Sequence, residues 1–267
     1  MSRTIYLLAA YDGTEFHGWQ RQPGMRTVQG VLEDALRRVL RHDVALVGCG
    51  RTDAGVHAAG HVSSFATTAS IETSKLRHAI GSRLPTDLAV LEAREVHPDF
   101  HATQSAVSKL YRYRIHHGQR RPVERDRQRY AYHCWHALDE LRMAAAARHF
   151  VGLLDFCAMT PVQNRRETTV RRVLRCDVAR HGDEVRIDVE GDGFLYHQVR
   201  TMAGTLIDVA RGINHPDDVP EVLASRDRSR AGPTAPAHGL CLRWVRYPPE
   251  LLGSPAICEP GLPPAAG

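Results

Sequence analysis

The sequence predicts an α+β fold built from two similar halves, and two observations support this. Short apolar, β-prone runs alternate with longer segments whose apolar residues recur every three or four positions, as expected for strands that alternate with amphipathic helices. This alternation occurs once before residue 104 and again after it. With 267 residues the chain is long enough for two small domains, and we expect lobes at 1–104 and 105–247.

The first half contains four runs that are typical of strands, at 5–10, 44–47, 61–66 and 88–96. The strongest helical pattern covers 28–40, where seven apolar residues follow the i, i+3, i+4 rule. Thr27 precedes this segment and is a suitable N-cap, because its hydroxyl can accept a backbone hydrogen bond. A second helix is expected at 72–82, ahead of Pro85.

The second half repeats this alternation. Its expected strands are 109–116, a hairpin formed by 170–179 and 185–189, and a last strand at 240–245. Its expected helices are 138–151, 196–211 and a shorter one near 216–225. Residues 248–267 are rich in Pro, Gly and Ala, so we expect them to form a poorly ordered tail.

The composition is that of a globular protein, with 43% hydrophobic and 24% charged residues. No apolar run approaches the roughly 20 residues that span a bilayer, and the N-terminus lacks the form of a signal peptide. We therefore expect no membrane association and a cytoplasmic location. The six cysteines include no C-x-x-C pair, which argues against a zinc ribbon and a disulfide scaffold.

The net charge of +5 is compatible with a polyanionic partner. Arginine carries almost all of the positive charge, since the chain has only two lysines, Lys75 and Lys109. A GC-rich genome would produce the same bias, whereas a guanidinium also suits bidentate phosphate binding. The run 191–193 (Gly-Asp-Gly) lacks the Lys and Ser/Thr of a phosphate-binding loop, so we expect no nucleotide cofactor.

One nine-residue run is the most informative feature of the chain. Residues 50–58 read Gly-Arg-Thr-Asp-Ala-Gly-Val-His-Ala and follow the apolar run 44–47. A strand that ends in a Gly-rich turn is well placed to present one carboxylate, here Asp53, to a ligand. For an isolated Asp the simpler interpretation is a turn cap, with Arg51 as its surface partner.

The whole run is more specific than that, and it resembles the catalytic loop of the TruA family of tRNA pseudouridine synthases. Other segments extend the resemblance in the family's order: 11–22 (YDGTEFHGWQRQ) with 27–29 (TVQ), 99–113, 193–206 and 231–240. Together the matched segments span about residues 4–247.

This resemblance implies two ferredoxin-like lobes whose sheets join into one extended sheet, with the active site in the cleft between them. It implies conversion of uridine to pseudouridine at positions 38, 39 and 40 of the tRNA anticodon stem-loop. It also implies an isomerase that needs no cofactor and no metal and works as a homodimer.

The resemblance assigns Asp53 as the catalytic nucleophile. Burial alone would raise the pKa of such a carboxylate, so nearby cations must keep it ionised. Arg51 is one candidate, and the resemblance supports Arg200 as another. Tyr111 is expected to stack on an extruded base or to accept the C5 proton. Tyr113 lies on the same face of the strand, so only the resemblance selects Tyr111.

Four polar or basic residues are the candidate RNA contacts: Gln20, Arg21, Arg26 and Arg112. Basic runs such as 109–129 are more often solvated faces, although aromatic residues within them favour RNA. Two rival functions remain. A non-catalytic RNA-binding or RNA-folding protein on this scaffold would not need the intact run around Asp53. The other rival is a different enzyme on RNA, such as a glycosidase or a nuclease. A nuclease would need carboxylate clusters able to hold two metals, and none surround Asp53 in the sequence.

Overall fold

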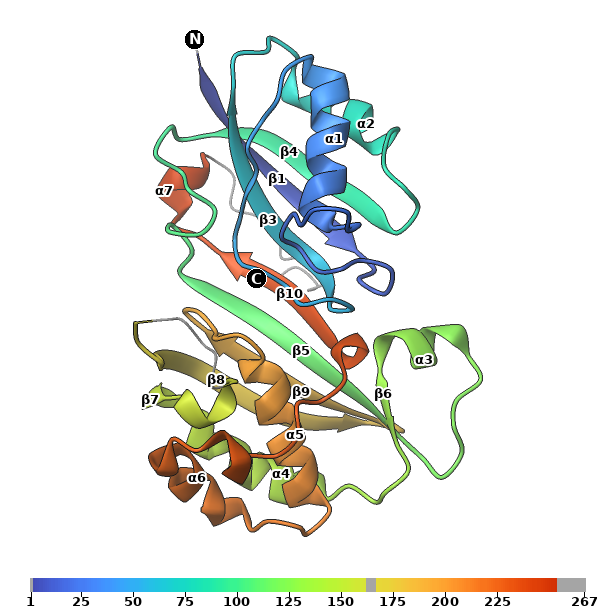
Figure 1. Cartoon of the computed structure of the whole chain (residues 1–267), viewed down its shortest axis with the longest axis vertical. Coiled ribbons are helices and arrows are strands. Elements are labelled where there is room, and N and C mark those ends of the chain that lie inside the picture. Colours follow the sequence, from blue (N-terminus) through green and yellow to red (C-terminus); the bar gives the residue numbers. More distant parts are fainter. Residues whose placement is uncertain (1, 162–166, 254–267) are drawn as a thin grey trace, which may run out of the picture. The chain divides into compact units, whose positions relative to one another are not determined.

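Strands and helices fall into two units in the computed structural model, which describes residues 2–161 and 167–253 (Figure 1). The units are Met1–Val107 with Leu242–Gly267 (unit 1), and Ser108–Cys241 (unit 2). Both units mix strands with helices, so the predicted α+β class is confirmed.

The first four strands of the chain form an antiparallel sheet in unit 1, with the first strand in the middle. They are β1 (Arg3–Tyr11), β2 (Val47–Gly48), β3 (His57–Thr67) and β4 (Leu88–Val96). β1 lies between β3 and β4 and is antiparallel to both, while β2 pairs with β3. The side chains of β1 are largely buried, because one side of the sheet is covered by helices and both neighbours are strands.

The prediction of a strand at 44–47 is wrong, since only Val47 belongs to β2. The reason is that two side chains of the preceding helix, Val28–Leu40, pair with the backbone groups of Leu46. Its N–H donates to the carboxylate of Glu33 (3.2 Å), and its carbonyl accepts from the side-chain amide of Gln29 (3.0 Å). A residue whose polar backbone atoms are already paired has no need of a ladder partner.

Two helices cover the same face of the unit 1 sheet (Figure 1). They are α1 (Val28–Leu40) and α2 (Thr73–Gly81). α1 matches its predicted bounds, and the predicted N-cap is confirmed because the Thr27 hydroxyl accepts from Gly30 N. The buried stripe of α1 consists of Val28, Leu32, Ala35, Leu36 and Leu40.

The chain returns to unit 1 through β10 (Leu240–Arg246) and ends its described part in α7 (Pro249–Leu252). The predicted second lobe included residues 242–247, whereas in the structure these residues belong to unit 1. A Cβ atom on Gly60 of β3 would lie 2.6 Å from the carbonyl oxygen of Arg243, which shows how closely β10 approaches.

The predicted tail begins at 248, yet its first residues are structured. Leu252 of α7 is buried, and His97 N donates to Leu251 O (3.1 Å). Residues 254–267 of that predicted tail lie outside the described residues.

Unit 2 has a sheet in the order β5–β9–β8–β7. Its strands are β5 (Ser108–His117), β6 (Tyr132–Cys134), β7 (Gly152–Asp155), β8 (Val170–His181) and β9 (Glu184–Gly191). β8 and β9 form the predicted hairpin, with His181 paired to Glu184 across the turn. β6 runs parallel to β5. β6 and β7 were not predicted, because three or four residues carry too little alternation.

The helices of unit 2 are α3 (Arg125–Tyr130), α4 (Glu140–Ala147), α5 (Gln198–Ala210) and α6 (Val219–Ser225). The described part of unit 2 also contains 3₁₀ turns at Arg148–Phe150, Cys157–Met159, Pro216–Asp218, Arg228–Arg230 and Ala237–Gly239. The predicted helix 138–151 is shorter at both ends. The Asp139 carboxylate caps α4 by accepting from Leu141 N and Arg142 N, and the chain tightens into a 3₁₀ turn after Ala147.

Within the described ranges, no helix is long and apolar enough to cross a membrane.

Candidate active site

Asp53 lies in the turn between β2 and β3 of unit 1. Val56 N donates to Asp53 O (3.1 Å), which closes the turn, and Gly55 adopts a left-handed conformation with φ of 78°. A left-handed residue favours glycine, because it has no Cβ to clash. The Asp53 side chain is half-buried, so it is partly shielded from water and still open to a ligand.

The segment after β1 holds this loop through backbone contacts. Trp19 N donates to Thr52 O (3.0 Å), and Gly55 N donates to Phe16 O (3.3 Å). Tyr11 and Thr52 share a buried hydroxyl hydrogen bond of 2.8 Å. The two sequence motifs, 11–22 and 50–58, therefore form one folded substructure.

Two buried histidines fill the space beneath the loop. His57 Nδ1 accepts from Gly13 N (3.0 Å) and lies 3.2 Å from the Asp12 carboxylate. His61 contacts Gly50 O through Nε2 (3.0 Å) and stacks on Trp19 with 3.7 Å between ring centroids. Both side chains pack the loop against the sheet, which agrees with a structural role.

Arg51 is exposed and points to a different partner from the one expected. Its Nε donates to the side-chain oxygen of Gln20 (3.1 Å). Among the described residues, Arg51 makes a hydrogen bond to Gln20 and does not form an ion pair with Asp53. The electrostatic support of Asp53 by Arg51 stays a prediction.

Two of the three loop residues predicted to contact RNA have ion-pair partners within the chain. Arg21 pairs with Glu33 (2.9 Å) and keeps a largely exposed side chain. Arg26 donates from both terminal nitrogens to Asp87 (2.9 and 2.8 Å) and lies over the Phe16 ring at 4.0 Å. The hydrogen bonds that Arg26 donates to Asp87 raise the pKa of Arg26. Arg26 therefore has a structural role, because it packs on Phe16, and Phe16 is bonded to the Asp53 loop through Gly55 N.

Tyr111 and Tyr113 occupy the buried face of β5 in unit 2. Tyr113 is fully buried and donates to Pro236 O (2.9 Å), and its burial raises its pKa. Tyr111 retains 8% exposure and meets the ring of Phe194 edge-on, with 5.4 Å between centroids. Because Tyr113 is tied into the core, Tyr111 is the better candidate for a base contact.

The two remaining predicted residues of unit 2 lie on different elements. Arg200 is in the first turn of α5, where its Nε donates to Ala235 O (2.8 Å). Arg112 lies on β5, on the face opposite Tyr111. Its guanidinium makes two 2.7 Å hydrogen bonds to Asp188, which raise the pKa of Arg112. A contact of Asp53 with Arg200 or Tyr111 stays a prediction.

Comparisons with known proteins agree with these features. The sequence profile of a family described as tRNA pseudouridine synthase matches residues 7–103 and 146–248. The chain belongs to this family.

Relatives in this family are similar over nearly their whole length. The tRNA pseudouridine synthase A of Pelobacter propionicus is 45% identical over 246 residues, which cover 92% of this chain and 100% of that one. The protein of the same name from Moorella thermoacetica is 44% identical, covering 91% of this chain and 99% of its own. A chain in the crystal structure of a Cbf5-Nop10-Gar1 complex is 12% identical with a TM-score of 0.36, covering 89% and 57%.

A pseudouridine synthase is an isomerase, and its chemistry requires precise placement of the reacting groups. The enzyme has to break the bond between N1 and C1′ of uridine and rejoin the detached base through C5. A nucleophile that moved with a floppy loop would lose the orientation that this requires. The profile match includes the Asp53 loop and Arg200, while Tyr111 lies between the matched ranges.

Sequence reasoning missed the residues that support the site. Gln29 and Glu33 stand on the polar side of α1 and hold the loop residues Gln20 and Arg21. The sequence did contain an indication of this role, because two polar residues that are four positions apart in an amphipathic helix lie on the same face. Nothing in the pattern, however, indicated that this face meets the loop before the helix.

Proposed function

We propose that this pseudouridine synthase acts on uridines 38, 39 and 40 of the tRNA anticodon stem-loop, with Asp53 as the nucleophile. The observation that carries the proposal is the Asp53 loop, a half-buried carboxylate in a turn whose backbone bonds to Phe16 and Trp19. The resemblance of 50–58 and the other motifs to the TruA family supports the choice of tRNA site.

The reaction is an isomerisation in which atoms balance without a redox partner. The Asp53 carboxylate attacks the ribose or the base and forms a covalent bond to it, and the N1–C1′ bond breaks. The base then turns, C5 forms a bond to C1′, and the bond to Asp53 breaks, which restores the free carboxylate. The proton on C5 leaves and N1 gains one. In this proposal Tyr111 stacks on the extruded base and accepts the C5 proton. Arg200 supplies positive charge that keeps the nucleophile ionised.

We propose further that the enzyme works as a homodimer in the cytoplasm, where both subunits contact one tRNA. The resemblance to the TruA family supports the dimer, and the tRNA substrate supports the location. Sedimentation velocity on the full chain, with and without tRNA, measures the oligomeric state. A monomer that binds and turns over one tRNA per chain would contradict the dimer.

The test of the function is tritium release from tRNA labelled at uridine C5, with wild type and Asp53→Asn side by side. Wild type should release tritium, and Asp53→Asn should be slower by more than about a thousandfold, because an amide cannot replace the nucleophile. Both should bind tRNA alike. Release at an undiminished rate by Asp53→Asn would remove Asp53 from its role.

A second arm separates the rival functions. Release that continues in EDTA agrees with the synthase, whereas a nuclease that uses two metals would stop. Intact tRNA binding without any release by wild type would favour the non-catalytic RNA-binding protein. Mapping of the product tRNA by primer extension after carbodiimide treatment locates the modified positions.

A further inference from the structure

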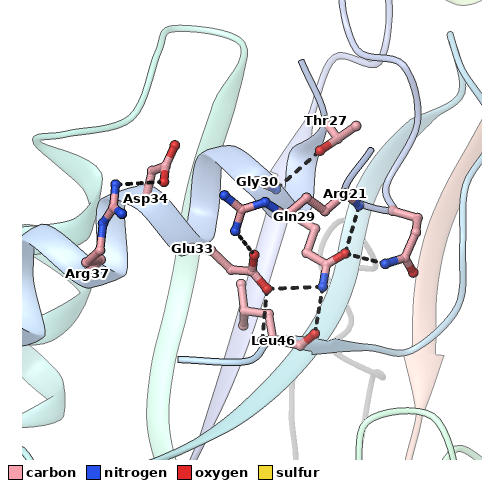
Figure 2. A network of polar contacts seen from close by, with 9 residues as sticks. Arg21, Thr27, Gln29, Gly30, Glu33, Asp34, Arg37 and Leu46 are labelled. Carbon is pink, nitrogen blue, oxygen red and sulfur yellow. Dashed lines mark hydrogen bonds and ion pairs between the residues drawn. The ribbon is translucent and has the colours of Figure 1, made fainter. Parts of the chain in front are cut away.

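A chain of side-chain hydrogen bonds connects helix α1 to Arg51. Figure 2 shows the part of this chain around Glu33 and Gln29. The Gln29 amide nitrogen donates to Glu33 (3.1 Å) and to Leu46 O (3.0 Å). The Gln29 amide oxygen accepts from Arg21 N and from the Gln20 amide nitrogen, both at 2.9 Å. Gln20 then presents its own amide oxygen to Arg51 Nε (3.1 Å).

This chain of hydrogen bonds has one possible direction. A carboxylate only accepts, so Glu33 requires the NH₂ group of Gln29 to face it. The amide oxygen of Gln29 must then face Gln20, whose NH₂ group donates a hydrogen bond to it. The amide oxygen of Gln20 is left for Arg51, whose guanidinium only donates. An anion at one end and a cation at the other thus fix both amides.

Two backbone groups enforce the same orientation at Gln29. Its oxygen accepts from the N–H of Arg21, and its nitrogen donates to the carbonyl of Leu46. A flipped amide would set donor against donor and acceptor against acceptor at both places. Leaving partly buried polar groups unpaired costs about 1–3 kcal/mol each, so the flipped state is not populated.

These hydrogen bonds fix one side of the Arg51 guanidinium and leave its other side exposed to solvent. Its Nε is fixed by Gln20, while its side chain is exposed and its terminal nitrogens have no partner among the described residues. These two nitrogens form the edge that binds a phosphate with two parallel hydrogen bonds. Arg51 is also only two residues from Asp53.

We propose that Gln20, Gln29 and Glu33 form a positioning relay that fixes Arg51 to bind a phosphate of tRNA. The relay rests on the proposed function for the identity of the RNA. Glu33 does not itself repel the RNA, because its carboxylate is largely buried and is paired with Arg21. Holding a long side chain in its bound geometry before the ligand arrives removes part of the entropy cost of binding.

The test is a double-mutant cycle of Gln20→Met and Arg51→Met, read as the Kd for tRNA. Methionine keeps the length of the side chain and removes its polar atoms. Gln20→Met should raise the Kd about threefold to tenfold, and Arg51→Met should raise it further. In the Arg51→Met background, Gln20→Met should have no further effect, because the relay then has nothing to hold.

Two further readouts separate positioning from general damage. At saturating tRNA, kcat of Gln20→Met should stay within about twofold of wild type while KM rises, since only binding is affected. The slope of log Kd against log salt should fall by about one in Arg51→Met, as for the loss of one phosphate contact. Equal effects of Gln20→Met in both backgrounds, or none in either, would overturn the relay.

Glu33→Gln and Asp34→Asn form a matched pair of variants on α1. Asp34 pairs with Arg37 (3.2 Å) on the exposed side of the helix, away from the relay (Figure 2). Removing either negative charge would strengthen RNA binding by charge alone. The relay instead predicts that Glu33→Gln raises the Kd about twofold to fivefold, because the new amide nitrogen must face a donor, either Arg21 or the pair of Gln29 and Leu46 N. A Glu33→Gln protein that binds tRNA more tightly, as Asp34→Asn should, would contradict the proposal.

The Kd measurements require no turnover, so they test the relay even if the protein does not catalyse the proposed reaction. The tritium arm judges the reaction independently of the relay. Thermal melts of each variant confirm that it is folded before its Kd is compared.

Discussion

At the residue scale, close backbone approach explains how the Asp53 loop stays rigid. A Cβ atom on Gly13 would lie 2.0 Å from the carbonyl oxygen of Val56, well inside van der Waals contact. The segment after β1 can therefore lie directly on the loop only with glycine at this place. The hydrogen bond from Gly13 N to His57 uses the same approach.

Gly13→Ala should unfold more readily and turn over more slowly than wild type. The added methyl group must push the loop away, which we expect to cost about 1–3 kcal/mol. Urea unfolding gives the stability, and tritium release gives the turnover. Gly81→Ala is the control, since a Cβ there meets nothing within 4 Å. Wild-type behaviour of Gly13→Ala would show that the loop does not depend on this contact.

The two tyrosines of β5 give a second contrast between function and stability. Tyr113→Phe loses a buried hydrogen bond to Pro236 and should lose about 1 kcal/mol of stability with kcat unchanged. Tyr111→Phe should lower kcat about a hundredfold, because the variant lacks the phenol proposed to take the C5 proton. Denaturant titration and tritium release on both variants decide this. Full turnover by Tyr111→Phe would restrict Tyr111 to stacking.

At the scale of elements, the strength of the hydrophobic period decided what the sequence could predict. α1 has an apolar residue at nearly every inward position, and its predicted bounds match. The strand expected at 44–47 failed, because Leu46 bonds to two polar side chains of α1. β6 and β7 are too short for any period. The polar face of α1 shows why tertiary contacts override local propensity.

Thr27→Ala should destabilise the protein by about 1 kcal/mol, because it removes the side-chain acceptor for Gly30 N at the start of α1. Thr27→Ser should keep most of that stability, since serine provides the same hydroxyl. The measurement is the urea midpoint of the three proteins at equal m-value. Equal midpoints for Thr27→Ala and wild type would show that the cap contributes nothing.

At the scale of the whole molecule, sequence motifs named the site residues but not what holds them. The motifs placed Asp53 in a loop and Tyr111 on a strand, and the structure agrees on both locations. The partner of Arg51 could not be predicted, because Gln20 is distant in sequence and its amide carries no charge. Arg112 offers a similar case, since its bond to Asp188 depends on strand register.

The stability of the protein should fall in acid through Glu184 on β9. Burial acts to raise the pKa of Glu184, but hydrogen bonds from Arg114 and Arg186 lower it below the ordinary value of 4.5. A folded-state pKa below the unfolded one stabilises the protein above that ordinary value, and this contribution is lost as the pH falls through the folded pKa.

Urea unfolding from pH 7 down to pH 3 measures this dependence. Glu184→Gln should be less stable at pH 7 and should show a flatter decline, because the variant lacks the titrating group. An identical pH dependence in wild type and Glu184→Gln would show that other carboxyl groups account for the acid sensitivity.

The return of the chain through β10 has a consequence for synthesis on the ribosome. Domains usually fold in the order in which they are made, yet unit 1 is interrupted by all of unit 2. The place beside Gly60 of β3 is taken by Arg243, and Tyr247 bonds to Ala102 O (2.6 Å). The unit that carries Asp53 is begun first and completed last, so a nascent chain stopped near residue 241 contains a complete second unit and an incomplete first one.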